Sequence, residues 1–101
     1  GIRITVGSDS FCSSLTPYGK YAITEMYALN KAGLSEMEVI QAATKNGAEM
    51  LKIDDITGTL EKGKFADLII LKDNPLSDIH NIDVEKMDVI MKEGEFVKNN
   101  L

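Results

Sequence analysis

The hydrophobic pattern of this chain changes near residue 54, and this change limits its fold more strongly than any other feature. Ile2 to Val6 alternates apolar with polar residues, as in a strand with one apolar face. From Tyr18 to about residue 51, apolar residues recur every three or four positions, which indicates helices. After Asp54 the pattern is that of short strands. We therefore predict an α/β chain, with one unit over residues 1–53 and a β-rich unit over residues 54–101.

Local signals predict where the helices begin and end. Thr16-Pro17 places a capping side chain before a proline suited to the first helical position, and Gly33 is typical of a helix end. Ser35 and Glu38 form a capping-box pattern at the start of a second helix. Asn46-Gly47 predicts a break before a last short helical turn. Three methionines at helical apolar positions are expected in the core: Met26, Met37 and Met50.

The second half of the chain predicts three strands. Ala66 to Leu71 is a short apolar run typical of a buried strand, and Asn74-Pro75 ends it because proline cannot donate to a sheet. Val89 to Met91 and Phe96-Val97 flank a turn that contains Gly94, which predicts a hairpin.

Length and composition exclude several classes of protein. A chain of 101 residues can form one modest core, whereas a complete barrel of parallel strands and helices needs about 250 residues. One cysteine and one histidine cannot form a disulfide or a four-ligand Cys/His zinc site. The net charge of −5 argues against nucleic acid as a partner.

The sequence also bears on location and completeness. It contains neither an apolar run of about 20 residues, as a membrane-spanning helix needs, nor a signal-peptide pattern, so we expect no membrane partner and a cytoplasmic location. The chain opens at Gly1 inside a strand pattern and without an initiator methionine, and we therefore expect it to be part of a longer protein.

Asp9 is the leading candidate for chemistry. It follows the end of an apolar strand, where α/β folds gather ligand and catalytic groups, and a carboxylate there can bind a divalent metal or accept a proton. An Asp-Ser pair is also a common turn or cap, and position alone leaves both interpretations open. Cys12 is expected to be an unreactive, partly buried thiol, and His80 a solvated loop histidine.

The order of the motifs resembles the C-terminal end of metal-dependent amidohydrolases, and within them the branch of imidazolonepropionase and prolidase. The resemblance covers the chain from Ile2 to Val97. It is carried by Gly7-Ser8-Asp9-Ser10, Thr16-Pro17-Tyr18-Gly19, the capped helix from Leu34 to Ala48, the stretch from Ile56 to Leu71, and Asn74-Pro75-Leu76. Tyr18 departs from the pattern, because many relatives have histidine at that position.

The resemblance implies a composite fold and a metal-dependent activity. This chain would hold the last strand and helices of a TIM-like barrel, followed by the C-terminal part of a small β-sandwich. In the family the aspartate after the last barrel strand binds a divalent metal, often zinc, and handles the proton of the attacking water. The matching residue is Asp9. The parent protein would hydrolyse carbon–nitrogen bonds in small amide-type substrates.

The resemblance also limits what this chain can do alone. The histidine ligands of the family, and its carboxylated lysine, lie upstream of the matched region, and His80 falls outside the metal motifs. We therefore expect the isolated chain to bind no metal tightly, to lack activity, and to self-associate through surface that the missing N-terminal part of the same protein would cover. The alternative is a non-catalytic binding or structural module that retains the amidohydrolase tail.

Overall fold

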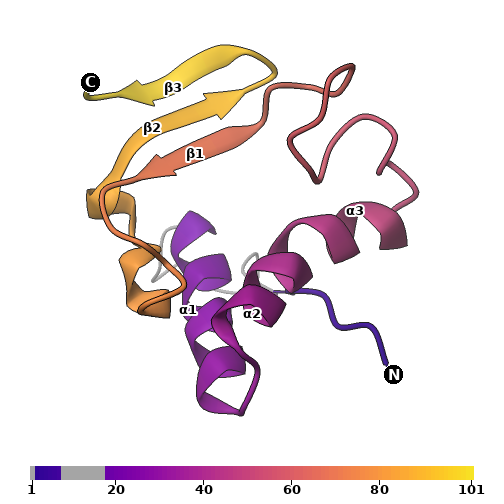
Figure 1. Ribbon diagram of the computed structural model, residues 1–101, viewed down its shortest axis with the longest axis vertical. Coiled ribbons are helices and arrows are strands. Elements are labelled where there is room, and N and C mark those ends of the chain that lie inside the picture. Colours follow the sequence, from indigo (N-terminus) through magenta and orange to yellow (C-terminus); the bar gives the residue numbers. More distant parts are fainter. Residues whose placement is uncertain (1, 8–17) are drawn as a thin grey trace.

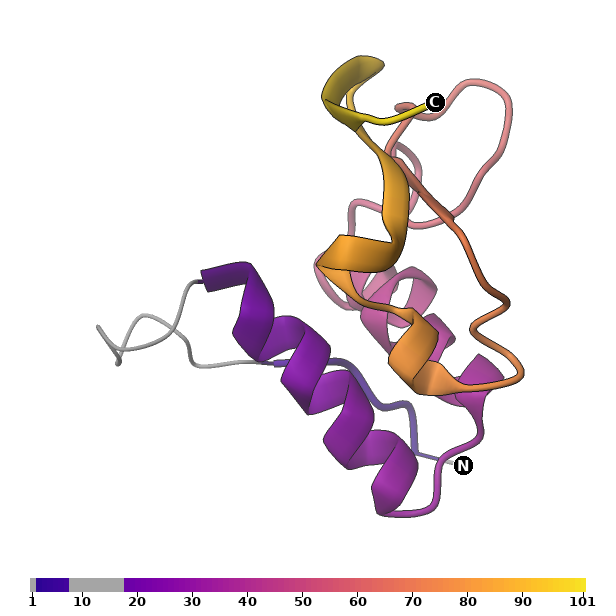
Figure 2. The same cartoon turned by 90° about the vertical axis from the view of Figure 1, so that its left-hand side faces the viewer.

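The computed structural model describes residues 2–7 and 18–101, with a sheet on one side and helices on the other (Figures 1 and 2). Short 3-10 turns connect the two parts. The helices are α1 Tyr18–Lys31, α2 Glu36–Ala43 and α3 Lys45–Met50; the turns are η2 Ile79–Asn81 and η3 Val84–Lys86; the strands are β1 Leu68–Leu71, β2 Met87–Lys92 and β3 Glu95–Asn99. The predicted α/β content is confirmed. None of the helices in the described residues is long and apolar enough to cross a membrane.

The predicted helix ends around Gly33 and Ser35 are confirmed. Gly33 has a φ of 122°, its amide donates to the carbonyl of Asn30, and the amide of Leu34 donates to that of Leu29, which is the Schellman arrangement. The Ser35 hydroxyl accepts from the Glu38 amide at 3.2 Å, and the Glu38 carboxylate accepts from the Ser35 amide at 3.0 Å. These caps set the short connection between α1 and α2.

A helix break is predicted at Asn46-Gly47, but the structure has it two residues earlier, at Thr44. Thr44 separates α2 from α3, with φ −128° and ψ −87°, whereas Asn46 and Gly47 are helical. The Thr44 hydroxyl donates to the Ile40 carbonyl at 2.7 Å, and its amide donates to the Gln41 carbonyl. A threonine hydroxyl that bonds the preceding turn competes with helix continuation, and this explains the break at Thr44.

The strand predicted from Ile2 to Val6 is wrong for the described chain, because residues 2–7 belong to neither a helix nor a strand. A strand requires a neighbour that completes a hydrogen-bond ladder, and no strand among the described residues pairs with this segment. The Val6 amide donates instead to the carbonyl of Ala42 in α2, at 3.2 Å. The segment therefore lies against helices rather than in a sheet.

The three strands form one antiparallel sheet in the order β1-β2-β3. Leu68 pairs with Met91 and Ile70 with Val89, which confirms a strand inside the predicted range. Burial of this strand was predicted wrongly, since Ile69 is 50% exposed and Ile70 is 43% exposed. Successive side chains of a strand point to opposite faces of the sheet, so the described residues cover neither face completely at β1.

The predicted hairpin is confirmed, and its turn explains how β2 and β3 are connected. Lys92 pairs with Glu95, so the loop consists of Glu93 and Gly94 alone. Both loop residues have positive φ, at 52° and 83°. Two residues of positive φ define the type I′ turn, whose twist matches that of antiparallel strands.

The core joins residues from both halves of the sequence. Its buried cluster consists of Met26 of α1, Val39 of α2, Ile79 of η2, Ile82 after it, and Met87 of β2. Side chains from before and after residue 54 thus pack together, while the division into two units at that residue stays a prediction.

Only one of the three methionines expected in the core lies there. Met26 is 8% exposed, whereas Met37 is 47% and Met50 is 61% exposed. Met37 lies two positions before the buried Val39 in α2, and Met50 lies two positions after the buried Ala48 in α3. Two positions correspond to about 200° around a helix, so these side chains face the opposite side.

The loop between α3 and β1 packs closely on α3 at Gly58. The Ile53 amide donates to the Ala48 carbonyl at 2.9 Å, which turns the chain back along the helix. Gly58 has a φ of 99°, and a Cβ built on it would lie 2.5 Å from the Cβ of Ala48. Gly58 is therefore required both by its backbone conformation and by the close approach to α3.

Replacement of Gly58 should destabilise the protein more than the same replacement of Gly63. Gly63 has a similar φ of 95°, but a Cβ there would meet no atom within 4 Å. We expect Gly58→Ala to lower the free energy of unfolding by about 2–4 kcal/mol, and Gly63→Ala by about 1–2 kcal/mol, because only the first adds overpacking to backbone strain. Chemical denaturation of both variants measures the difference. Equal losses would show that the contact with Ala48 contributes nothing.

Candidate functional site

Asp9, the leading candidate from the sequence, lies outside the described residues, as does Cys12. The described structure therefore shows the segment that leads to Asp9 rather than its carboxylate. Tyr18, where the sequence departs from the resemblance, is the first residue of α1. Residues 2–7 and the start of α1 thus flank the stretch that contains both candidates.

The segment that leads to Asp9 is held by α2 and α3. Besides the bond between the Val6 amide and the Ala42 carbonyl, the side-chain amide of Asn46 donates to the carbonyl of Ile4 at 3.0 Å. Both bonds go to the backbone of the segment, so they fix its path whatever its side chains are. The residue pattern at Asn46 indicates only a helix break, and nothing in it signals this contact.

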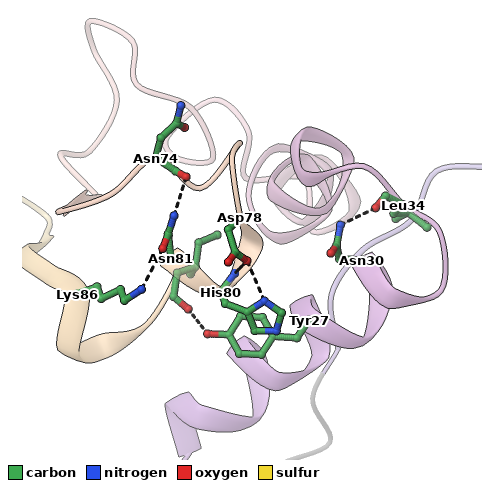
Figure 3. A network of polar contacts seen from close by, with 9 residues as sticks. Tyr27, Asn30, Leu34, Asn74, Asp78, His80, Asn81 and Lys86 are labelled. Atoms are coloured by element: carbon green, nitrogen blue, oxygen red, sulfur yellow. Dashed lines mark hydrogen bonds and ion pairs between the residues drawn. The ribbon is translucent and has the colours of Figure 1, made fainter.

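His80 is exposed, as the sequence predicts, but it is not free. Figure 3 shows its ring beside that of Tyr27 in α1, with the ring centroids 4.4 Å apart and the planes tilted by 36°. Its Nδ1 atom lies 2.9 Å from the Asp78 carboxylate, which also accepts from the His80 amide. The Asp-x-His spacing signals the local contact, whereas no sequence pattern could indicate Tyr27, which lies 53 positions upstream.

Tyr27 anchors the turn η2 to the helix α1. Its hydroxyl donates to the carbonyl of Ile82 at 2.5 Å. Partial burial raises the pKa of Tyr27, and the nearby carboxylates of Asp83 and Asp78 raise it further. The phenol therefore stays protonated and continues to donate this hydrogen bond throughout the neutral range.

The remaining polar contacts around His80 stabilise the Asn-Pro turn. The Asn81 side chain donates to the carbonyl of Asn74 at 2.9 Å, and Lys86 donates to the Asn81 side chain at 3.0 Å (Figure 3). The Asn74 side chain in turn accepts from the Leu76 amide at 2.9 Å. Each group has a structural partner, so the cluster around His80 is best explained as a support for this turn.

Three carboxylates of the described residues have a pKa that is shifted by near neighbours along the chain. Hydrogen bonds from Ser35 lower the pKa of Glu38, and hydrogen bonds from Thr59 and Lys64 lower that of Glu61. The His80 amide and ring lower the pKa of Asp78. A general acid at neutral pH needs the opposite shift, towards a raised pKa. These three carboxylates therefore lack the signature of acid catalysis.

The described residues do not assemble a metal site by themselves. Within residues 2–7 and 18–101, no three side chains of His, Cys, Asp or Glu gather closely enough to hold a metal ion. Asp9 could add one carboxylate, whereas catalytic zinc is held by three protein ligands in most enzymes.

Asp67 connects the loop before β1 to the hairpin turn. One oxygen of its carboxylate accepts from the Thr57 hydroxyl at 2.7 Å, and the other accepts from the Glu93 amide at 2.8 Å. The neighbouring carbonyl of Ala66 accepts from the Gly94 amide at 3.1 Å. Both bonds lower the pKa of Asp67, and the bond from Thr57 has the larger effect. We interpret Asp67 as a structural carboxylate.

Comparisons with known proteins identify where such a chain occurs. Residues 1–97 match the sequence profile of the amidohydrolase family. The chain is 44% identical over 71 residues to the imidazolonepropionase of Picrophilus torridus, which covers 69% of this chain and 17% of that protein. It is 35% identical over 80 residues to the ochratoxinase of Aspergillus niger, covering 78% of this chain and 16% of that protein.

The fold agrees with a solved structure of the same kind. A Xaa-Pro dipeptidase with bound methionine in its active site superposes with a TM-score of 0.83 at 34% identity, covering 98% of this chain and 23% of the dipeptidase. The chain thus spans less than a quarter of each of these three proteins.

The role of Asp67 predicts a pH-dependent loss of stability. Its pKa is lowered by folding, so the ionised carboxylate stabilises the fold above its unfolded pKa of about 4, and this contribution disappears as the pH falls through the lower folded value. We expect Asp67→Ala to be less stable than the parent at pH 7, and the difference to shrink as the pH falls below about 4. Thermal unfolding across this pH range measures it.

Asp54→Ala is the matched control, because Asp54 is exposed and no hydrogen bond or ion pair of its side chain is found among the described residues. It should show no comparable pH-dependent difference. A constant gap between Asp67→Ala and the parent from pH 7 to pH 2 would contradict the assignment.

Proposed function

Because this chain belongs to the amidohydrolase family, we propose that it is the C-terminal part of a metal-dependent hydrolase that cleaves carbon–nitrogen bonds in small molecules. The observation that supports this most directly is the family match, which extends over residues 1–97 and so includes Asp9 together with the helices that follow. The relatives carry different names, and the barrel loops that would select a substrate are outside this chain. We therefore commit to the bond type and to no single substrate.

In the proposed whole protein, residues 2–7 are the last strand of a TIM-like barrel. The segment approaches Asp9 beside α2 and α3, which hold it through the bonds to Ala42 and Asn46. The three-stranded sheet would be the C-terminal part of a small β-sandwich, which agrees with the exposure of Ile69 and Ile70 on its edge strand β1.

Asp9 is the proposed metal ligand and proton acceptor. In the whole protein, Asp9 would help to hold a divalent metal, zinc in this proposal, which would supply a water molecule of lowered pKa. The Asp9 carboxylate suits such a group, because it can share a metal and take the proton of the attacking water. His80 has no ligand role in this proposal, because it falls outside the metal motifs of the resemblance.

The upstream sequence tests this proposal directly. We expect the coding DNA before Gly1 to add about 300 residues with a His-x-His motif after an early strand, as a complete barrel and its metal site require. A start codon directly before Gly1 would favour the alternative, a free-standing binding module.

Activity measurements test the role of Asp9. The purified 101-residue chain should show no metal-dependent hydrolysis of amide substrates, because a single carboxylate cannot hold zinc against water. In the full-length protein, Asp9→Asn should lower kcat by at least about a thousandfold, since it removes both a ligand and a base. Hydrolysis by the isolated chain that Asp9→Asn abolishes would overturn the proposal.

We expect the isolated chain to form dimers or larger assemblies. Apolar side chains are exposed on the strands β1 and β3 and on the loop after α3, notably Ile69, Phe96, Val97 and Leu60. Open strand edges and exposed apolar surface both favour association. Light scattering at tens of micromolar measures the mass, and a monomer at that concentration would contradict this expectation.

A further inference from the structure

One face of the α2–α3 pair contacts the segment that leads to Asp9. Asn46, Glu49 and Met50 are spaced as i, i+3 and i+4, so they share one face of α3, and Ala42 lies one turn before them. Each of these four residues has a partner in the extended segment, at residues 3–6. We call these four residues the clamp face.

The four contacts differ in strength. The ion pair between Arg3 and Glu49 lies at the surface, with 65% of the Arg3 side chain exposed, and such pairs contribute little. The Thr5 hydroxyl contacts the Met50 sulfur at 3.8 Å, and a thioether is a weak acceptor. The two bonds to the backbone of the segment remain as the main contacts. They join Val6 to Ala42 at 3.2 Å and Ile4 to Asn46 at 3.0 Å.

The helix break at Thr44 makes the first of these bonds possible. In an uninterrupted helix, the carbonyl of Ala42 would accept from the amide four residues later, that of Asn46. Because α2 ends at Ala43, this carbonyl is among the last ones of its helix and is available to the Val6 amide. The break also begins a new helix whose second residue, Asn46, reaches Ile4.

From this arrangement we propose that Asn46 is a positioning residue, whose carboxamide, together with the Ala42 carbonyl, fixes residues 2–7 and thereby the point from which the Ser8-Asp9 stretch departs. The inference rests on the proposed function for its catalytic meaning, because it assigns Asn46 to Asp9. The requirement at position 46 is specific, since the Ile4 carbonyl needs a donor. A carboxylate of the same shape accepts hydrogen bonds but cannot donate one.

Hydrogen exchange of the 101-residue chain tests whether the clamp face holds the segment. We expect Asn46→Asp to raise the exchange rate of the Val6 amide about tenfold, as the loss of one well-placed hydrogen bond predicts. The Val39 amide, which bonds the Ser35 carbonyl within α2, should stay within about twofold of the parent. An unchanged exchange rate of the Val6 amide would show that Asn46 does not hold the segment.

Asn30→Asp is the matched control. The Asn30 side chain donates to the backbone carbonyl of Leu34 at 2.9 Å, so this variant removes the same kind of bond at the end of α1. It should leave the Val6 amide within about twofold of the parent. An equal rise of the Val6 exchange rate in both variants would show a general loss of stability, and it would contradict a specific role of Asn46.

Kinetics of the full-length protein test the link to Asp9. Asn46→Asp should lower kcat about tenfold or more with KM within about twofold, because displacement of a catalytic group affects the chemical step more than binding. Asn30→Asp should leave both constants unchanged. If Asp9→Asn abolishes activity while Asn46→Asp and Asn30→Asp behave alike, the positioning role fails and the proposed function stands.

The reverse result is equally distinct. If Asp9→Asn keeps full activity, the proposed function fails, and Asn46 loses its catalytic meaning. The exchange rate of the Val6 amide would still decide whether Asn46 holds the segment.

Discussion

The buried cluster that contains Val39 of α2 and Ile79 of η2 is the constraint on which the rest of this structure depends. Val39 is fully buried and Ile79 is 1% exposed, and their cluster joins the helices to the strands. Full burial of an aliphatic side chain of this size contributes about 1.5–3 kcal/mol. Without this cluster, the apolar side chains of the helices would have no partners in the second half of the chain, and the sheet would have no core to pack on. The polar contact between Tyr27 and Ile82 then fixes the orientation of the two parts.

The features that could be predicted from the sequence are those set by neighbouring residues. Ser35 and Glu38 lie three positions apart, and Glu93 and Gly94 are adjacent, so the energy of each motif is local. The predictions that are wrong concern residues whose structure depends on partners far away in the sequence. Ile2 to Val6 has the alternation of a strand, but pairing depends on other strands. The alternation therefore describes what the segment could form rather than what it forms here.

The candidate site shows the same division. The resemblance carried by motif order gave the family, and the match over residues 1–97 confirms it. Asp9 was predicted from its place after a strand, and its role stays a proposal. The contacts of His80 with Tyr27 and of Asn46 with Ile4 span more than 40 positions, and nothing in the residue types predicts them. Long-range side-chain bonds depend on how the helices cross, which the fold alone determines.

The break at Thr44 also determines where this chain can change its length. One residue inserted between Thr44 and Asn46 would rotate the following helix face by about 100° and turn it away from the segment that it holds. Substitutions leave this rotational phase unchanged. The loop that follows α3 has no helical phase to preserve, although Gly58 packs on Ala48 and the Thr57 hydroxyl bonds Asp67. A change of chain length between Thr44 and Asn46 therefore disturbs the contact with the segment more than the same change in the loop after α3.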